Sequence, residues 1–554
     1  VEQIAAHYAQ RPCIVGWQID NEINCESDEF YSEADSDAFR AFVKEKYTSL
    51  DALNDAWGTV VWSQTYTDWS EIHVPRLTIH NSTNPHEMLD YYRFVSESAI
   101  SFCALQAAIL RKYVKEGDFI TTNGMFGHLD NHRMMDTCLD VFTYDSYPNF
   151  AFCLSEDPRH SDDLNDRKWS RNLSEVRSVC PHFGIMEQQA GANGWNTRME
   201  APTPRPGQLT LWTMQSIAHG ADYVGFFRWR TAVTGTEIYW HGILDYDNRD
   251  NRKLAEVSRV FERVQKIQDI AGADYVAEVG LLRDFDNDWD ADVDVWHRHL
   301  RKASEKAVFT ACQLSHTPLD MVNLSDETEA EELQKYRVLF YPHPLILTEA
   351  RVKTLERYVE SGGVLVIGAR TGMKDAHGRC RMSPMPGLLS SLSGTSVREY
   401  SFIGPMDDPS TIRWGEKKLP AGIFNDVLEA ERGDVKVLAC YASGACEGAA
   451  ALIERKVKKG AVLHFGGTFE RDTVDEMLRA LSVRAPFRDI IQLPEKCEIA
   501  VREKKENKGS KYLFVLNYSW QAEEIVLTEA MKDLDSGSIV QGRTELKAFE
   551  TRVY

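Results

Sequence analysis

The sequence predicts an α/β protein that begins with part of a (β/α)8 (TIM) barrel, continues with a doubly wound, flavodoxin-like domain and ends with a small β-sandwich. Strands and helices alternate to about residue 270 and, with different turn residues, to about 485, and short strands fill the rest. We therefore expect domains at 1–270, 271–485 and 486–554. Three domains suit this length, because single cores rarely exceed about 250–300 residues.

Five short apolar runs in the first region are predicted to be barrel strands. They lie at 13–18, 118–123, 139–144, 183–187 and 222–228, and amphipathic helices are expected at 36–57, 87–115, 165–179, 207–219 and 252–270. A barrel of this kind builds its active site at the carboxyl ends of its strands. Only five such strands are visible in this region.

The second region again alternates strand and helix. VGLLRDF opens it, and VLFYP at 338–342 and GGVLVIGAR at 362–370 have the composition of buried parallel strands, with helices expected at 296–315 and 348–361. This pattern predicts an open, doubly wound sheet. The glycines around 362–370 lack the G-x-G-x-x-G order, which favours a structural role for them over nucleotide binding.

The last region is predicted to be all-β. EIAVREK, KYLFVLNYS, EEIVLTE and KAFETRVY have the composition of short strands, and the turn signals NKGS and DSGS separate several of them. So small a unit has little core of its own, and we expect it to pack on the rest of the chain.

Composition narrows the range of partners. A formal net charge of −21 argues against nucleic acid, which is bound largely through Lys and Arg. No apolar run reaches the roughly 18 residues of a membrane span, so we expect no membrane partner. The 11 cysteines are scattered and contain no C-x-x-C pair, which favours reduced thiols in a cytoplasmic protein over a disulfide framework.

Two predicted strands end in a carboxylate. IVGWQIDNEIN at 14–24 ends in Asn21 and Glu22, and FGIMEQQAGANGWN at 183–196 carries Glu187 at the equivalent strand end. A helix N-cap at Asn21 and an ordinary exposed strand end at Glu187 are the alternatives. Two carboxylates on one barrel face are, however, what both mechanisms of glycoside hydrolysis require, and the Asn21 amide can bind a sugar hydroxyl beside them.

Aromatic side chains crowd the same predicted strand ends. Trp62, Tyr147 and Trp195 lie in loops that also bear Asn, Gln or Glu, and Tyr239 and Trp240 lie in GTEIYWHG. Because pyranose rings pack their CH faces on aromatic planes, these residues suggest a sugar-binding wall. Any one of them can equally be a core residue.

Glu237 and His241 could hold two sugar hydroxyls. Their spacing would also allow a metal on a helical face, but the flanking glycines predict a loop and no third ligand is evident, so we predict no metal and no cofactor. Arg228 and Arg230 could orient carboxylates or form a structural ion pair.

Several of these segments together resemble one family. They are GWQIDNE, WGTVVWSQTYTDWSEIHVPR, TTN, YDSYP, MEQQ and FFRWRTAVTGTEIYWHG. This set resembles the β-galactosidases of glycoside hydrolase family 42, whose catalytic barrel, doubly wound domain and small β domain follow in the same order. The resemblance is closest in residues 1–250.

The resemblance implies a retaining hydrolase of terminal β-D-galactosides with Glu22 as acid/base and Glu187 as nucleophile. It also implies that Asn21, Trp62, Tyr147, Trp195, Glu237 and His241 contact the galactosyl unit. It further implies that the chain forms a homotrimer. β-D-Fucosides and α-L-arabinopyranosides are alternative substrates, because a hydroxymethyl group at one ring position distinguishes these sugars.

Three features depart from the family pattern. In much of the family the histidine follows the glutamate by three residues, whereas here Trp240 stands in that place and His241 follows. The cysteine cluster that binds zinc in some members is represented only by Cys25, so no such zinc is expected. Members also carry three barrel strands before the segment with which this chain begins, which implies that the five strands expected here are strands 4 to 8. The alternative function is therefore an inactive fragment or a non-catalytic sugar-binding relative.

Overall fold

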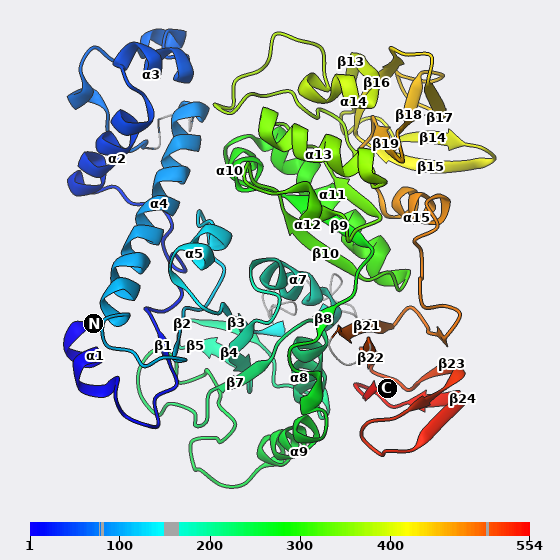
Figure 1. Cartoon of the computed structure of the whole chain (residues 1–554). Helices are drawn as coiled ribbons and strands as arrows, with labels where there is room; N and C mark the ends of the chain where they lie inside the picture. Colours follow the sequence, from blue (N-terminus) through cyan, green and yellow to red (C-terminus); the bar gives the residue numbers. More distant parts are fainter. Residues whose placement is uncertain (77, 79–81, 149–164, 506–508) are drawn as a thin grey trace.

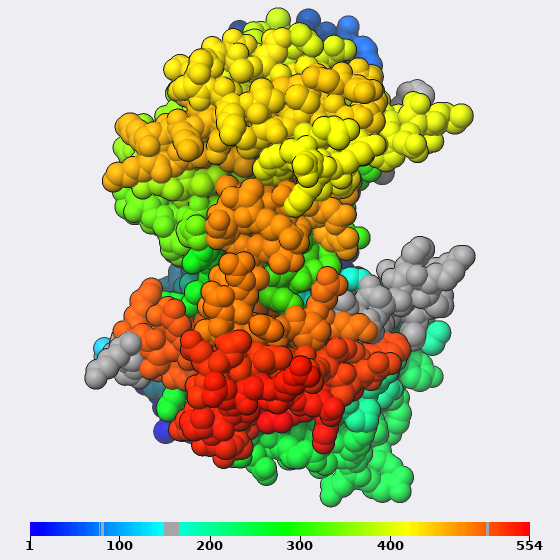
Figure 2. Space-filling model, turned by 90° about the vertical axis from the view of Figure 1, so that its right-hand side faces the viewer, coloured from blue at the N-terminus to red at the C-terminus, as the bar shows by residue number. Residues whose placement is uncertain are grey.

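The computed structural model describes residues 1–554 except 77, 79–81, 149–164 and 506–508. Figure 1 shows three regions, with the second above the first and the third beside the first. In the turned view of Figure 2, the second region stands over the other two across a narrower waist.

Five parallel strands form the centre of the first region: β1 (Gly16–Gln18), β2 (Phe119–Thr121), β3 (Thr143–Ser146), β4 (Gly184–Gln189) and β7 (Tyr223–Phe227). β1 pairs with β2, and β4 pairs with both β3 and β7. A bond of 3.1 Å from the Thr143 amide to the Thr122 carbonyl joins β2 to β3. The five carboxyl ends therefore lie along one edge. A hairpin of β5 (Asn193–Trp195) and β6 (Arg198–Ala201) follows β4.

Helices follow most of these strands. They are α1 (Glu2–Tyr8), α2 (Glu33–Lys46), α3 (Leu50–Trp57), α4 (Pro85–Leu110), α5 (Asn131–Cys138), α6 (Asn165–Lys168), α7 (Ser170–Val179), α8 (Gln208–Ala218) and α9 (Arg252–Lys266). The single helix predicted at 36–57 is wrong, because the chain turns at Tyr47 and the Ser49 side chain caps a new helix by accepting from the Ala52 amide.

The third barrel strand begins later than the 139–144 predicted for it. Leu139 still ends helix α5, and the Asp140 carboxylate accepts a hydrogen bond of 2.7 Å from the Ile120 amide. Both residues are occupied in closing the turn, so β3 starts only at Thr143 and runs on to Ser146. The shift brings Asp145 into the strand.

Helix α4 is the one helix in the described part of the chain that is long and apolar enough, by length and composition, to cross a membrane. Ile100, Cys103, Ala107 and Leu110 on one face of α4 belong to the core around β2 and β3. Core helices of ordinary globular domains have the same composition.

The second region holds an 11-stranded sheet. Its parallel half contains β9 (Val279–Arg283), β10 (Leu319–Asn323), β11 (Val338–Tyr341), β12 (Val364–Ile367) and β19 (Gly460–Phe465) in the spatial order β10-β9-β11-β12-β19. That order is the 2-1-3-4-5 of flavodoxin-like sheets. Helices α10 (Phe285–Val293), α11 (Val295–Leu314), α12 (Ala330–Leu333), α13 (Glu349–Ser361), α14 (Ser390–Ser393) and α15 (Arg471–Ala480) accompany it.

An antiparallel half extends this sheet and was not predicted. It comprises β13 (Thr395–Phe402), β14 (Ser410–Trp414), β15 (Lys417–Gly422), β16 (Phe424–Ala430), β17 (Val435–Tyr441) and β18 (Ala450–Val457). β18 joins the halves by pairing antiparallel with β19. The sequence signal for β17 is weak, since VKVLACY mixes exposed and buried positions without regular alternation.

The third region has two antiparallel sheets around one core. One contains β8 (Asp274–Tyr275), β21 (Cys497–Lys504), β22 (Ser510–Asn517) and β25 (Thr551–Val553), and the other β20 (Ile491–Gln492), β23 (Glu523–Lys532) and β24 (Ile539–Leu546). Ile499, Val515 and Ile525 pack between them. As expected, the region also packs on the first, where Phe514 and Tyr518 share a core with α8.

Candidate functional site

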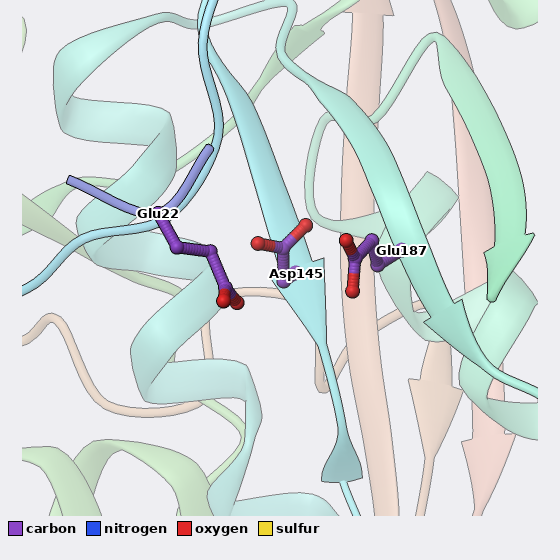
Figure 3. A group of neighbouring side chains, drawn as sticks. All are labelled: Glu22, Asp145 and Glu187. Atoms are coloured by element: carbon purple, nitrogen blue, oxygen red, sulfur yellow. The ribbon is translucent and has the colours of Figure 1, made fainter. Parts of the chain in front are cut away.

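Three carboxylates converge at the carboxyl ends of the parallel strands. Glu22 lies on the loop after β1, Asp145 on β3 and Glu187 on β4, and their side chains point toward one another in Figure 3. One oxygen of each lies within 4.8 Å of the others. Glu22 and Glu187 are half-buried, whereas Asp145 is 6% exposed. The predicted pair is thus brought together, with a third acid that the sequence had not singled out.

Asn123, which follows β2, connects the first two acids. Its amide nitrogen donates to Asp145 Oδ2 at 2.7 Å and to Asn21 Oδ1 at 3.0 Å. Its amide oxygen accepts from the Glu22 backbone at 3.1 Å and from the Gln18 side chain at 2.9 Å. Asn123 is only 2% exposed, so this network is held rigidly inside the protein.

The loop that bears Glu22 is strained. Asp20, Glu22 and Asn24 all have φ between 45° and 66°, a region that residues other than glycine rarely adopt. Such strain persists only where the surroundings enforce it, and here Asn123 holds the Glu22 amide. The position of the Glu22 carboxylate is therefore set by a specific contact.

Tyr147 contacts Glu187 directly. Its hydroxyl donates to Glu187 Oε2 at 2.5 Å, and its ring meets that of Trp240 edge-on with the centroids 5.2 Å apart. Burial raises the pKa of Tyr147 far above its usual value, and the neighbouring charge of Glu187 raises it further. Tyr147 therefore remains a hydrogen-bond donor at every physiological pH.

Like charges dominate the electrostatics of the three acids. Burial and the charge of Glu187 raise the pKa of Asp145 to about 9, although the hydrogen bond from Asn123 acts in the opposite direction. Burial also raises the pKa of Glu187, the charge of Glu22 adds to this, and the Tyr147 hydroxyl opposes it. Three carboxylates this close cannot all be ionised.

Glu237 lies on the loop between β7 and α9, beside Arg228. The Arg228 guanidinium lies 3.3 Å from Glu237 Oε2 and donates to the carbonyls of Glu237 and Trp240. The opposite charges of Glu237 and Arg228 both act on the pKa of Glu187, the first raising it and the second lowering it. Of the two arginines considered from the sequence, Arg228 thus forms an ion pair at the site.

His241 follows on the same loop. Its Nδ1 lies 3.4 Å from Asp245 Oδ1, and its backbone amide donates to the Ala192 carbonyl at 2.9 Å. A side chain at Gly191 would collide with His241, because a Cβ there would lie 2.6 Å from the His241 Cβ and 2.7 Å from the His241 carbonyl oxygen. Gly191 therefore lets this loop pack tightly against the loop after β4.

Trp195 and Trp62 have different surroundings. Trp195 lies on β5 and is half-buried, with the Arg198 guanidinium 4.1 Å above its ring. The backbone amide of the next residue, Asn196, donates to the Thr236 carbonyl and so joins the hairpin to the Glu237 loop. Trp62 lies on the turn after α3 and is 78% exposed. In Figure 1, α3 lies at the end of α4 remote from the strands. The structure therefore does not bring Trp62 to the carboxylates within this chain.

The three acids also satisfy the geometry of a cation site. Their donors are all carboxylate oxygens, the ligands that Mg²⁺ and Ca²⁺ prefer. The absence of a metal remains a prediction from the sequence.

A cavity of about 760 Å³ lies elsewhere, between the first and second regions. Its walls come from α5, α7, α10 and α11, and neither Glu22 nor Glu187 lines it. Its inner charges are paired: Arg283 contacts Glu175 at 2.6 Å and Asp288 at 2.7 Å, and Arg301 contacts Glu305 at 2.6 Å. The chemistry points to the carboxylate cluster and not to this cavity.

Sequence reasoning missed Asp145 and Asn123 as site residues. Both lie in segments that were noticed, YDSYP and TTN, so the available signal was a polar residue at the end of a predicted strand. Asp145 was overlooked because the strand was expected to end at Tyr144. Asn123 was overlooked because its partners lie about 100 residues earlier in the chain.

Three family models match consecutive parts of the chain. The model described as "Beta-galactosidase" matches residues 1–267, "Beta-galactosidase trimerisation domain" matches 277–487, and "Beta-galactosidase C-terminal domain" matches 499–554. The chain is 33% identical to beta-galactosidase BgaA of Clostridium cellulovorans, covering 100% of this chain and 80% of that protein. It is 30% identical to beta-galactosidase BgaH of Haloferax lucentense, with the same two shares.

Solved structures resemble the whole chain. A GH42 beta-galactosidase, Gan42B from G. stearothermophilus, matches with a TM-score of 0.89 at 26% identity, covering 100% of this chain and 80% of that one. The beta-galactosidase of the Antarctic haloarchaeon Halorubrum lacusprofundi matches with a TM-score of 0.86 at 27% identity, again covering 100% and 80%.

Proposed function

The chain belongs to the family 42 β-galactosidases of the glycoside hydrolases, and from this premise we propose that it hydrolyses terminal, non-reducing β-D-galactosides with retention of configuration. The observation that carries the proposal is the approach of Glu22 and Glu187 at the carboxyl ends of β1 and β4, with an oxygen of each within 4.8 Å of the other. Retaining enzymes place their two carboxyl groups about 5–5.5 Å apart, whereas inverting enzymes need about 6.5–9.5 Å to admit a water.

In the proposed mechanism Glu187 is the nucleophile. Its carboxylate attacks the anomeric carbon as Glu22 donates a proton to the leaving oxygen, which forms a covalent galactosyl-enzyme and releases the aglycone. Glu22 then takes a proton from water, the resulting hydroxide attacks the same carbon, and the bond to Glu187 breaks. The hydroxyl of Tyr147 at 2.5 Å orients the nucleophile for both steps.

The remaining predicted contacts would surround the galactosyl ring. Asn21 is hydrogen-bonded to Asn123, which holds the Glu22 backbone, and Tyr147 donates to Glu187 directly. Glu237 is close enough to act on the pKa of Glu187. His241 lies on the Glu237 loop, and Trp195 lies on the hairpin that the Asn196 amide joins to that loop. We propose that these five side chains bind the sugar, and that Trp62 does so only if another subunit presents it.

We infer that the five parallel strands correspond to strands 4 to 8 of a (β/α)8 barrel. Their single row, parallel direction and shared site edge support this, as does the family model that matches residues 1–267. We propose domains at 1–270, 271–485 and 486–554.

Ten described cysteines are free thiols, which supports a reducing compartment such as the cytoplasm.

We further propose that the protein is a homotrimer, on the strength of the trimerisation-domain match at 277–487. That region bears an aromatic face of Trp296, Tyr400 and Phe402, which are 46%, 54% and 45% exposed. The rings of Trp296 and Phe402 lie 4.6 Å apart, so the face is continuous. Exposed clusters of this kind mark contacts between subunits.

Sedimentation velocity tests the assembly. Trp296→Ser should shift the protein toward smaller species at micromolar concentration. The matched control is Trp520→Ser, because Trp520 is also 46% exposed but lies in the third region. An unchanged trimer in the first variant would remove the aromatic face from the interface, and a monomeric native protein would contradict the trimer itself.

Azide rescue tests the catalytic assignment. In Glu187→Gly, hydrolysis of an aryl β-galactoside should fall by roughly 10⁴-fold, and azide should restore turnover from the vacated side and yield the α-galactosyl azide. In Glu22→Ala, azide should instead attack the galactosyl-enzyme and yield the β-galactosyl azide. Exchanged stereochemistry would exchange the two roles, and full activity of Glu187→Gly would refute the function. Parallel aryl β-fucoside and α-arabinopyranoside substrates decide which sugar is preferred.

A further inference from the structure

Asp145 has an unusual position for a buried acid. It lies on β3 directly opposite Glu187 of β4 in the parallel register, and Figure 3 places its carboxylate between those of Glu22 and Glu187. It is 6% exposed, which makes it the most buried of the three acids. The mechanism proposed above uses the two glutamates and leaves Asp145 without a role.

The two oxygens of Asp145 have different surroundings. Oδ2 accepts the 2.7 Å hydrogen bond from Asn123, whereas Oδ1 is buried without a hydrogen-bond partner among the described residues. A buried carboxylate oxygen that lacks a donor is costly. The same oxygen becomes satisfied if it carries a proton, because it can then donate to a neighbouring carboxylate.

Both neighbours can accept such a bond. Glu22 and Glu187 each offer an oxygen within 4.8 Å of Asp145, a separation that a small side-chain movement closes to hydrogen-bond length. Of the two, Glu22 needs a donor more, because Glu187 already accepts from the Tyr147 hydroxyl at 2.5 Å. Glu22 is also the acid that gives up and takes back a proton during the cycle.

We propose that Asp145 is a positioning residue of the galactosidase site: it keeps its proton on Oδ1 throughout the cycle and donates it as a hydrogen bond to Glu22. This inference rests on the proposed function and deepens it. When Glu22 has given its own proton to the leaving oxygen, Asp145 stabilises and orients the resulting carboxylate, which then takes a proton from water. Asp145 neither gains nor loses a proton in either step.

The surroundings of Asp145 support this assignment. Burial and the charges of both glutamates raise its pKa to about 9, so the neutral form prevails at neutral pH. Asn123 completes the arrangement, because the same amide group that donates to Asp145 Oδ2 also holds the Glu22 backbone through its oxygen. The proton donor and the acid/base loop are therefore fixed by one side chain.

Asp145→Asn provides the central test, because an amide has the shape of a neutral acid: its nitrogen can donate to Glu22 while its oxygen accepts from Asn123. We expect kcat/KM for an aryl β-galactoside within about tenfold of the native value, with the alkaline limb of the pH profile unchanged or at higher pH. Asp145→Ala, which removes the donor, should lose about 10²-fold or more in kcat.

An ionised Asp145 predicts the opposite result. Its negative charge would favour the protonated form of Glu22, so Asp145→Asn would move the alkaline limb to lower pH. That shift, a loss of more than about 10²-fold in Asp145→Asn, or native activity in Asp145→Ala would each overturn the proposal.

Asp426→Asn is the matched control. Asp426 is a fully buried acid on β16 in the second region, its Oδ1 also has no partner among the described residues, and burial raises its pKa to about 6. Its substitution should leave the pH profile in place; if it moves the alkaline limb as well, the effect is not local and the proposal fails. Failure of the catalytic assignment itself is visible separately, in the azide experiment on Glu187→Gly.

Discussion

A buried aspartate, Asp145, and a half-buried one, Asp286, have opposite surroundings in this molecule. Asp286 on α10 lies between two arginines, with 2.8 Å contacts to Arg93 of α4 and to Arg351 of α13, whereas Asp145 lies between Glu22 and Glu187. Burial raises the pKa of Asp286, but the positive charges of the two arginines outweigh it and lower the pKa to about 2. At Asp145 burial and the charge of Glu187 act together and raise the pKa to about 9.

The difference shows that the sign of the neighbouring charges, more than burial, decides what a buried acid can do. Asp286 is always ionised and joins a helix of the first region to two helices of the second, which is a structural role. Asp145 holds a proton beside the two groups that move protons in the reaction. Perturbed acids without a cationic partner are typical of functional sites.

The largest expected effect comes from removing one of the like charges. Glu22→Gln should lower kcat/KM by roughly 10²–10⁴-fold for galactosides with poor leaving groups, because these need a proton on the departing oxygen. Activated aryl galactosides should lose less in their first step. Glu26→Gln, at an exposed position on the same loop, is the control and should retain native kinetics. Equal losses for good and poor leaving groups would argue against an acid/base role.

Neutralising the acid between the arginines should affect stability instead. Asp286→Asn removes the counterion that Arg93 and Arg351 share, but these arginines keep their ion pairs with Asp90 and Asp284, so we expect the free energy of unfolding to fall by about 1–3 kcal/mol. Urea denaturation measures this loss, and the pH profile of the remaining native protein should be unchanged. The exposed pair of Asp472 and Arg471 supplies the control, for which Asp472→Asn should change stability by less than about 1 kcal/mol.

The two aspartates should also give opposite pH dependences of stability. Because the pKa of Asp145 is raised by folding, its contribution to the free energy of unfolding is fully present below the pKa of an unfolded aspartate, about 3.9, and is lost as the pH rises toward 9. Asp145→Asn should therefore gain stability relative to the native protein over that interval. Because the pKa of Asp286 is lowered by folding, its contribution to the free energy of unfolding is lost as the pH falls toward 2. The destabilisation by Asp286→Asn should therefore shrink at acid pH. Parallel trends in the two variants would contradict the comparison.

The smallest expected effect concerns the residue that links Asp145 to the Glu22 loop. Asn123→Ala removes the donor to Asp145 Oδ2 and the acceptor for the Glu22 amide, so the strained loop should lose its fixed position. We expect a loss of about tenfold in kcat with a smaller change in KM. Gln10, which is exposed and donates a hydrogen bond to the Tyr113 carbonyl, offers a control in Gln10→Ala. Native kcat in Asn123→Ala would show that the loop needs no such support.

Much of this arrangement could be predicted from the sequence. Glu22 and Glu187 were identified because each ends an apolar strand, and the parallel half of the second sheet follows from its buried runs. The break at Tyr47 was missed because the apolar periodicity continues across it, although Ser49 has the form of an N-cap. The antiparallel strands were missed because strands such as β17 mix exposed and buried positions without regular alternation.

The role of Asp145 could not be read from the sequence for a different reason. Its pKa depends on which charges face it, and these come from β1, β3 and β4, which are far apart in the chain. Asp286 illustrates the same limit, since Arg93 and Arg351 are contributed by two different regions. Local pattern identifies an acid, but only the fold determines whether arginines or glutamates surround it.

Infrared difference spectroscopy at neutral pH tests the central contrast most directly. The native spectrum minus that of Asp145→Asn should contain the carbonyl band of a protonated carboxylic acid, which shifts when the protein is transferred to deuterium oxide. The native spectrum minus that of Asp286→Asn should contain the bands of an ionised carboxylate and no acid band. If the acid band is missing from the first difference spectrum, Asp145 is ionised in the folded protein and the account of the site is wrong.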